Sequence, residues 1–289
     1  MNLFDALVTE ALKNQPHLSP LRIVVEKELL HHDILRVLRD NHLTAGLTFI
    51  GGTCLRACYG GVRLSEDLDF TGGSGFSRDS LSTMGLILTE SLNAKYGLQV
   101  IVSEPIKDRD QQNVDTWKIK IETRPGLKHF PSQRINIDIC ALPSYEKQPM
   151  MLLNPYNVDM GTSGLIIQAQ SREEIYADKL IAFAFRPNRI KYRDLWDISW
   201  LHGQGFKPRL ELIPNKLQDR NYTLDYFLNS FEERQKWLIE RPEMADEFQQ
   251  EMRRFLSGEQ IKTLAQPNLW PFIVNLMEDL GNQIRRSVG

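Results

Sequence analysis

The chain has 289 residues, enough for one large domain or two small ones with a sizeable hydrophobic core. Its 35 Lys and Arg residues nearly balance its 37 Asp and Glu residues, so a nucleic-acid partner would have to bind a local basic patch. Three cysteines argue against a disulfide framework, and no segment reads as a membrane span or a signal peptide. These features predict a cytoplasmic protein without a membrane anchor.

The first part of the chain is predicted to pass from helices into a short strand that ends at two glycines. Apolar residues recur at helical spacing in the ranges 3–13 and about 21–40. The apolar run 47–50 then reads as a buried strand, and a short helix is expected over 54–59. A second short strand is predicted at 68–70.

The middle of the chain is predicted to add a helix and three more strands. The helix is expected over 77–95, and the strands near 98–103, 114–123 and 134–141. Alternating apolar residues indicate that each of the last two strands has one buried face.

Beyond about residue 170 the pattern is helical. Ser171 and Glu174 form a capping box for a helix that reaches Phe185. The sequence therefore predicts an α+β fold, with a small mixed sheet flanked by helices and a helical C-terminal region. The expected divisions are an N-terminal helical lead (1–44), a core (45–170) and a helical C-terminal domain (171–289).

The glycines at 51 and 52 are candidates for a phosphate site. At a strand-to-helix turn, glycines let backbone N–H groups approach an anion, and the helix N-terminus adds partial positive charge. Thr53 adds a hydroxyl at the same end. The alternative is that these glycines serve only the sterics of a turn.

Asp67 and Asp69 are candidate metal ligands. Residues two apart on a strand point to the same side, so the two carboxylates would repel each other unless a cation sits between them. Such an oxygen-rich site suits Mg²⁺ completed by substrate phosphates. The alternative is a solvated acidic turn. Together with the glycines, the acids suggest transfer of a nucleotidyl unit from a nucleoside triphosphate, with pyrophosphate leaving.

A third carboxylate is expected on a neighbouring strand. In the segment 134–139 isoleucines take one face, and Asn136 and Asp138 take the other. A charge in so apolar a strand needs a partner, which is either the site or a salt bridge, for example to Arg134.

Three segments resemble motifs of the AbiEii/AbiGii-type nucleotidyltransferase toxins, within the polymerase β superfamily. They are Gly51-Gly52-Thr53 with RLSEDLDF at 63–70, EIYADKL at 174–180 and RDLWDI at 193–198. The resemblance covers roughly residues 45–200. It implies a nucleotidyltransferase fold: a small mixed sheet flanked by helices, with a helical domain behind it.

The resemblance also implies site residues and partners. Asp67 and Asp69 would bind Mg²⁺, or alternatively Mn²⁺, and the residue pattern above adds Asp138 as the third acid of that site. Lys179 would reach the nucleotide, and Asp194 would be the site acid of the later motif. Ser65 would contact the nucleotide or cap locally. Characterised members of the family are toxins paired with an antitoxin, and some attach nucleotides to the acceptor end of tRNA.

Residue chemistry alone leaves the two later motifs open. Lys179 borders an apolar helix stripe, so its ammonium either snorkels to water or meets an anion. Asp194 could favour a helix start or pair with Arg193. Four cations (Arg186, Arg189, Lys191 and Arg193) surround Tyr192, which reads either as an RNA surface or as a solvated loop.

The sequence thus favours an enzyme that moves a nucleotide from a nucleoside triphosphate to RNA, with the acceptor end of tRNA as the expected target, and that acts as the toxin of a toxin–antitoxin or phage-defence pair. One alternative is transfer to a protein or a small molecule. Another is a nucleotide-binding module without catalysis whose helical region docks a partner.

Overall fold

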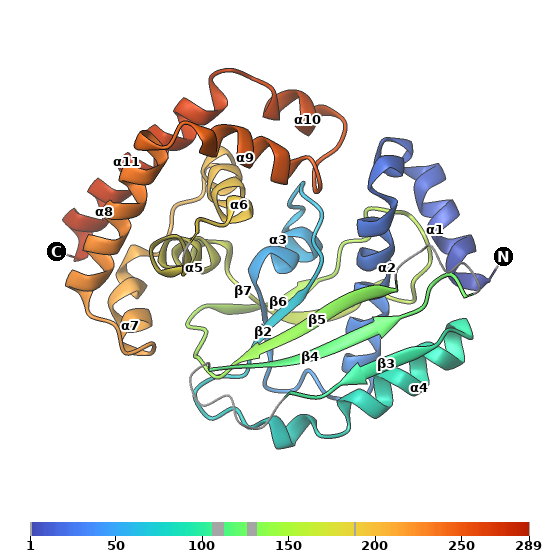
Figure 1. Ribbon diagram of the computed structural model, residues 1–289. Coiled ribbons are helices and arrows are strands. Elements are labelled where there is room, and N and C mark those ends of the chain that lie inside the picture. The colour runs from blue at the N-terminus through green and yellow to red at the C-terminus, as the bar shows by residue number, and fades with distance from the viewer. Residues whose placement is uncertain (1, 106–112, 126–131, 188, 289) are drawn as a thin grey trace. The chain divides into compact units, whose positions relative to one another are not determined.

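The computed structural model describes residues 2–105, 113–125, 132–187 and 189–288 (Figure 1). Contacts between Cα atoms divide the chain into two compact units, residues 1–170 and 171–289. Every strand among the described residues lies in the first, which we call the sheet unit, and we call the second the helical unit. No helix in the described part of the chain is long and apolar enough to cross a membrane.

The sheet unit is built on one seven-stranded sheet. Its strands are β1 (Thr48–Ile50), β2 (Leu68–Thr71), β3 (Val100–Ser103), β4 (Val114–Ile121), β5 (Gln133–Cys140), β6 (Lys147–Met151) and β7 (Ile166–Gln170). They lie in the order β3-β4-β5-β2-β1-β7-β6. The neighbours β2 and β5 are parallel, as are β1 and β7, and the other pairs are antiparallel, so the sheet is mixed as predicted.

One face of the central strands forms the hydrophobic core. In β5 Ile137 is fully buried, and the register places it beside Leu68 of β2 and Trp117 of β4. Because side chains alternate along a strand, the neighbouring register partners Asp69 and Asp138 lie on the opposite face. The alternation of apolar and polar residues thereby separates the core from a polar face.

Four α-helices accompany the described part of the sheet. They are α1 (Leu3–Asn14), α2 (Arg22–Asp40), α3 (Gly51–Tyr59) and α4 (Met84–Tyr96). Helix α2 packs on α4 and contacts β5, whereas α3 contacts β1, β2 and β7. Helix α3 begins directly after β1, which places the glycine turn at the end of a central strand.

The helical unit packs helices around an aromatic and aliphatic core. Its α-helices are α5 (Arg172–Phe185), α6 (Tyr192–Gly203), α7 (Ile213–Gln218), α8 (Leu224–Glu240), α9 (Glu243–Met252), α10 (Glu259–Leu264) and α11 (Leu269–Val288). Helix α5 packs on α6 and α8, and Phe183 meets Phe231 edge to face at 5.0 Å between ring centroids. The Ser171 hydroxyl accepts a hydrogen bond from the Glu174 amide at 3.1 Å, which is half of the predicted capping box.

The α+β fold class predicted from the sequence is confirmed, and three details differ. Helix α3 starts at Gly51 rather than Cys54, so the glycines form its first turn. The segment 77–95 is split into a 3₁₀ turn (Arg78–Leu81) and α4. Strands β6 and β7 were not predicted, because β6 is a largely exposed strand containing Pro149 and neither strand alternates cleanly.

Candidate active site

The first turn of α3 is shaped by its two glycines. Gly51 has a φ of 76°, a left-handed value that disfavours a side chain. A Cβ atom there would lie 2.7 Å from Oδ2 of Asp69, so the glycine also lets that carboxylate approach the helix start. The residue before the helix, Ile50, offers no capping side chain. Backbone N–H groups of a first turn have no intrahelical acceptor, which makes this end suited to an anion.

Gly52 makes room for a buried arginine that the sequence did not single out. A Cβ atom on Gly52 would overlap the guanidinium of Arg63, which is 5% exposed. Nη1 of Arg63 donates to the Leu64 carbonyl at 3.2 Å. Arg63 lies in the RLSEDLDF motif, and its burial against a glycine turn could not be read from one sequence. The structure therefore adds a cation beside the start of α3.

The hydroxyls of Thr53 and Ser65 lie 2.5 Å apart and are buried. Thr53 Oγ1 is also hydrogen-bonded to the Asp67 carbonyl, and the Ser65 amide donates to Glu28 of α2 at 2.8 Å. These bonds fasten α3 and α2 to the segment that leads into β2. They favour a positioning role for both hydroxyls, and direct contact with a nucleotide stays a prediction.

Two of the predicted carboxylates share the polar face of β2 and β5, and the third, Asp67, lies just before β2. Asp69 and Asp138 are register partners on parallel strands, so their side chains share a face. Oδ1 of Asp67 accepts from the Asn136 amide at 3.0 Å, and Oδ1 of Asp138 accepts from the Thr116 hydroxyl at 2.7 Å. A hydroxyl of β4 is thus one partner of Asp138.

The donor chemistry of this face suits a hard divalent cation, because Mg²⁺ and Mn²⁺ prefer carboxylate oxygens. Among the described residues, however, no three His, Cys, Asp or Glu groups are gathered closely enough to hold a metal as they stand. The bond from the Asn136 amide to Asp67 and the bond from the Thr116 hydroxyl to Asp138 both use Oδ1 and so orient these carboxylates. The face supplies the ligand types, and the carboxylates would have to close around the ion.

The later motifs meet within the helical unit. The Lys179 ammonium on α5 lies 2.6 Å from Asp194 and 2.9 Å from Asp197, both on α6, and Arg186 lies 2.7 Å from Asp194. Lys179 therefore meets an anion of its own chain instead of only snorkelling, and Asp194 pairs with Lys179 and Arg186. Burial alone would raise the pKa of Asp194, but the charges of Lys179 and Arg186 outweigh burial and hold it well below its ordinary value.

Two other acids of the EIYADKL motif belong to the packing of the helical unit. Glu174 is fully buried and lies 2.6 Å from the buried ammonium of Lys216 on α7. Asp178 pairs with the same lysine at 3.0 Å and with Arg220 at 3.2 Å. The motif thus joins α5 to α7 through its acids and to α6 through Lys179.

The basic stretch around Tyr192 is not one uniform surface. Arg186 is bound to Asp194, and Arg193 lies 3.7 Å from Glu251 and over the Phe255 ring. Arg189 is exposed, whereas Lys191 is half-buried. Burial first, and then the nearby Arg186 charge, lower the pKa of Lys191 to about 8. Two of the four cations, Arg186 and Arg193, are therefore paired within the chain and are less available to RNA phosphates.

Comparison with known proteins places these residues in a family. The family described as nucleotidyl transferase AbiEii toxin, type IV toxin–antitoxin system, matches residues 33–270. A comparison with curated proteins gave no match.

Among solved structures, the chain resembles MenT4, a nucleotidyltransferase toxin from Mycobacterium tuberculosis H37Rv, at 18% identity and a TM-score of 0.59, covering 98% of this chain and 92% of that one. It also resembles JHP933 from Helicobacter pylori at 16% identity and a TM-score of 0.48, covering 92% and 93% of the two chains. The MenT4 likeness supports the fold, and the family match extends over most of the chain. The chain belongs to the AbiEii family of nucleotidyltransferase toxins of type IV toxin–antitoxin systems.

Proposed function

We propose that this nucleotidyltransferase moves a nucleoside monophosphate unit from a nucleoside triphosphate to a hydroxyl of RNA, with tRNA as the first acceptor to test. The observation that carries the proposal is the pairing of Asp69 with Asp138 on one sheet face, with Asp69 against the uncapped glycine start of α3. This juxtaposition offers an anion site and carboxylates side by side, as nucleotidyl transfer requires.

The glycine turn and the carboxylates have separate roles in this proposal. Backbone N–H groups at Gly51 and Gly52 bind phosphate oxygens, while Thr53 and Ser65 hold the turn in place. Asp67 and Asp69 hold Mg²⁺ or Mn²⁺, and Asp138 is the third carboxylate of that site and orients the attacking hydroxyl. The ion would supply positive charge at the phosphates of the substrate. The acceptor oxygen forms a bond to the α-phosphorus as the bond to pyrophosphate breaks.

We also propose roles for Lys179 and Asp194 of the helical unit. The Lys179 ammonium supplies positive charge for a phosphate of the nucleotide, and Asp194 holds that ammonium in place. The 2.6 Å contact between the two supports this division of roles. Asp194 would then be a positioning residue whose effect on transfer runs through Lys179.

The family assignment also bears on partners. A toxin of a toxin–antitoxin system requires a cognate antitoxin, and RNA and nucleoside triphosphates are found in the cytoplasm, where we place the protein. Transfer to a protein or a small molecule is the alternative outcome for the acceptor. A non-catalytic nucleotide-binding module is disfavoured because the chain belongs to a nucleotidyltransferase family.

The decisive experiment incubates the protein with total RNA, Mg²⁺ and each labelled nucleoside triphosphate in turn. We expect one RNA class to carry the label and pyrophosphate to be released. The variants Asp67→Asn, Asp69→Asn and Asp138→Asn should each reduce transfer by about 100-fold or more, on the scale of losing a group that positions charge in a transition state.

Asp40→Asn is the matched control, because Asp40 is an exposed acid at the end of α2. It should leave transfer unchanged. Near-normal Mg²⁺-dependent transfer by Asp69→Asn would remove the assignment of the site. Label on a protein or small molecule instead of RNA would contradict only the assignment of RNA as the acceptor.

A further inference from the structure

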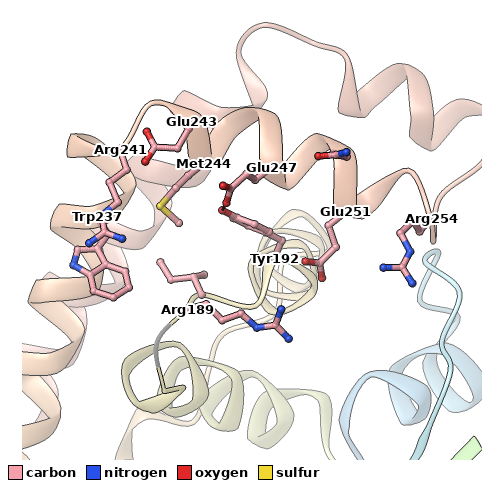
Figure 2. A pocket seen from close by; sticks show the side chains of 11 residues that line it. Arg189, Tyr192, Trp237, Arg241, Glu243, Met244, Glu247, Glu251 and Arg254 are labelled. Carbon is pink, nitrogen blue, oxygen red and sulfur yellow. Dashed lines mark hydrogen bonds between the residues drawn. The ribbon is translucent and has the colours of Figure 1, made fainter.

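A pocket of about 490 Å³ lies within the helical unit, apart from the pairing of Lys179 with Asp194. Its walls come from the segment before α6, from the end of α8, from α9 and from Arg254 (Figure 2). The volume lies within the range of small-molecule sites and would hold a single nucleotide. None of the residues that line this pocket has a role in the proposed reaction.

Three arginines at the pocket are available for an anion. Arg189, Arg241 and Arg254 line it and are exposed. Within the described residues, none of the three guanidinium groups forms an ion pair. Exposed guanidinium groups that are not neutralised by their own chain can bind phosphate in a bidentate manner.

A stacking surface lies at one end of the pocket. The Arg241 guanidinium lies 3.9 Å from the ring centroid of Trp237, and Arg234 lies 3.8 Å from the same ring. Figure 2 shows the Arg241 guanidinium next to the Trp237 ring at the pocket wall. Unpaired bases stack on planar guanidinium groups as well as on aromatic rings, so Arg241 can extend this stack to a base.

Carboxylates of α9 also line the pocket. Glu243, Glu247 and Glu251 recur at four-residue spacing on α9, so they share one face of the helix. Glu247 accepts from the Tyr192 hydroxyl at 2.5 Å, and Glu251 lies 3.7 Å from Arg193. Burial, and then the bond to Glu247, raise the pKa of Tyr192, so that hydroxyl remains a donor. Carboxylates accept hydrogen bonds from exocyclic amino groups such as N4 of cytosine.

We propose that this pocket binds one unpaired nucleotide of the RNA acceptor, with its phosphate on the arginines, its base stacked on Arg241 and its base edge toward the glutamates of α9. The inference rests on the proposed transfer to RNA and adds a second binding site in the helical unit. It selects an unstacked base with an amino group, since uracil offers no exocyclic donor to a carboxylate.

Because both arginines and glutamates line the pocket, it favours a ligand that carries an anionic group and hydrogen-bond donors. A purely basic peptide would meet three arginines, and a duplex phosphate backbone would meet three glutamates. A single nucleotide carries both a phosphate and a base edge with donors, so it can bind both the arginines and the glutamates of the pocket. A protein segment with alternating charges is the remaining competitor and is tested directly below.

The test measures binding of fluorescent 12-residue oligo(C) and oligo(U) by anisotropy, without nucleoside triphosphate or divalent metal. Wild-type protein should bind oligo(C) about 5-fold or more tightly than oligo(U), the scale of one base-edge contact. Arg241→Glu should weaken oligo(C) binding by about 10-fold or more. Glu243→Gln combined with Glu247→Gln should reduce the preference for oligo(C) over oligo(U).

Two matched controls lie on α11. Arg286→Glu and Glu278→Gln change exposed residues outside the pocket and should bind both oligonucleotides as wild type does. Circular dichroism and thermal melting confirm that each variant is folded.

Equal oligo(C) affinities for Arg241→Glu and Arg286→Glu would overturn the proposal. So would binding of an alternating Glu-Lys peptide that is lost in Arg241→Glu while oligonucleotide binding is kept, which would assign the pocket to a protein partner. The failure of the proposed function has a different signature: wild-type protein would label no RNA with any nucleoside triphosphate, whatever the pocket variants bind.

Discussion

The candidate site aspartates of the two units have different described partners. In the sheet unit, neutral groups orient the candidate carboxylates: an amide donates to Asp67 and a hydroxyl donates to Asp138. In the helical unit, cations surround Asp194, with Lys179 at 2.6 Å and Arg186 at 2.7 Å. The first arrangement fixes the direction of two carboxylates. The second neutralises its acid within the fold, so that acid contributes to stability as well as to a site.

The strongest way to break this comparison is to neutralise one aspartate from each unit. Asp194→Asn should lower the free energy of unfolding by about 3–5 kcal/mol, because Lys179 and Arg186 lose a buried anion. Asp138→Asn keeps a side-chain oxygen for Thr116 and should cost about 1 kcal/mol or less. Urea denaturation at pH 7 measures both values.

Equal losses of stability in the two variants would contradict the contrast between the units. Lys179→Met in the Asp194→Asn background provides the coupling test, because removing both charges should be less costly than the sum of the two single changes. Additive losses would mean that the 2.6 Å contact contributes little.

The second prediction concerns a buried histidine of the sheet unit. His32 lies on α2, and its Nδ1 is 3.0 Å from the Thr162 hydroxyl. Burial lowers its pKa to about 4, although the nearby Glu28 charge acts in the opposite direction. In the unfolded chain this histidine should have its ordinary pKa of about 6.5, so between about pH 6.5 and pH 4 it is protonated in the unfolded state and neutral in the folded state. The free energy of unfolding should therefore fall as pH decreases through this range.

This histidine should account for about 3 kcal/mol of the stability lost between pH 6.5 and 4, from a shift of roughly two and a half units. His32→Asn keeps a donor or acceptor near the Nδ1 position and cannot gain that proton. Denaturation curves of both proteins at several pH values isolate the difference, since other acids titrate alike in both. Parallel pH profiles for the variant and wild type would contradict the assignment.

How well the sequence predicted each feature depends on whether the interactions that form it are local or distant along the chain. The glycine turn, the DLD strand and the isoleucine alternation around Ile137 are local patterns, and each forms an element close to the predicted position. The residue pattern predicted Asp138 on a neighbouring strand, but its register with Asp69 depends on strand order, which no local pattern encodes. Burial of Arg63 against Gly52 and the contact of Lys179 with both aspartates of α6 depend on packing, and no local period encodes them.

The last prediction concerns Lys191, the half-buried cation beside Asp194. Burial and the Arg186 charge lower its pKa to about 8, so the folded chain gives up this proton well below the unfolded pKa of about 10.5. The unfolded state binds more protons between these values, and stability should therefore rise with pH in this window. Relative to Lys191→Arg, which keeps its charge, the wild type should gain about 1 kcal/mol in free energy of unfolding between pH 8 and 9.

RNA affinity should change in the opposite direction if Lys191 contacts phosphate. It should fall over the same pH range in the wild type and stay constant in Lys191→Arg. If stability rises while RNA affinity falls over this pH range, Lys191 contacts RNA as well as packing within the fold. An unchanged RNA affinity would show that Lys191 does not belong to the binding surface.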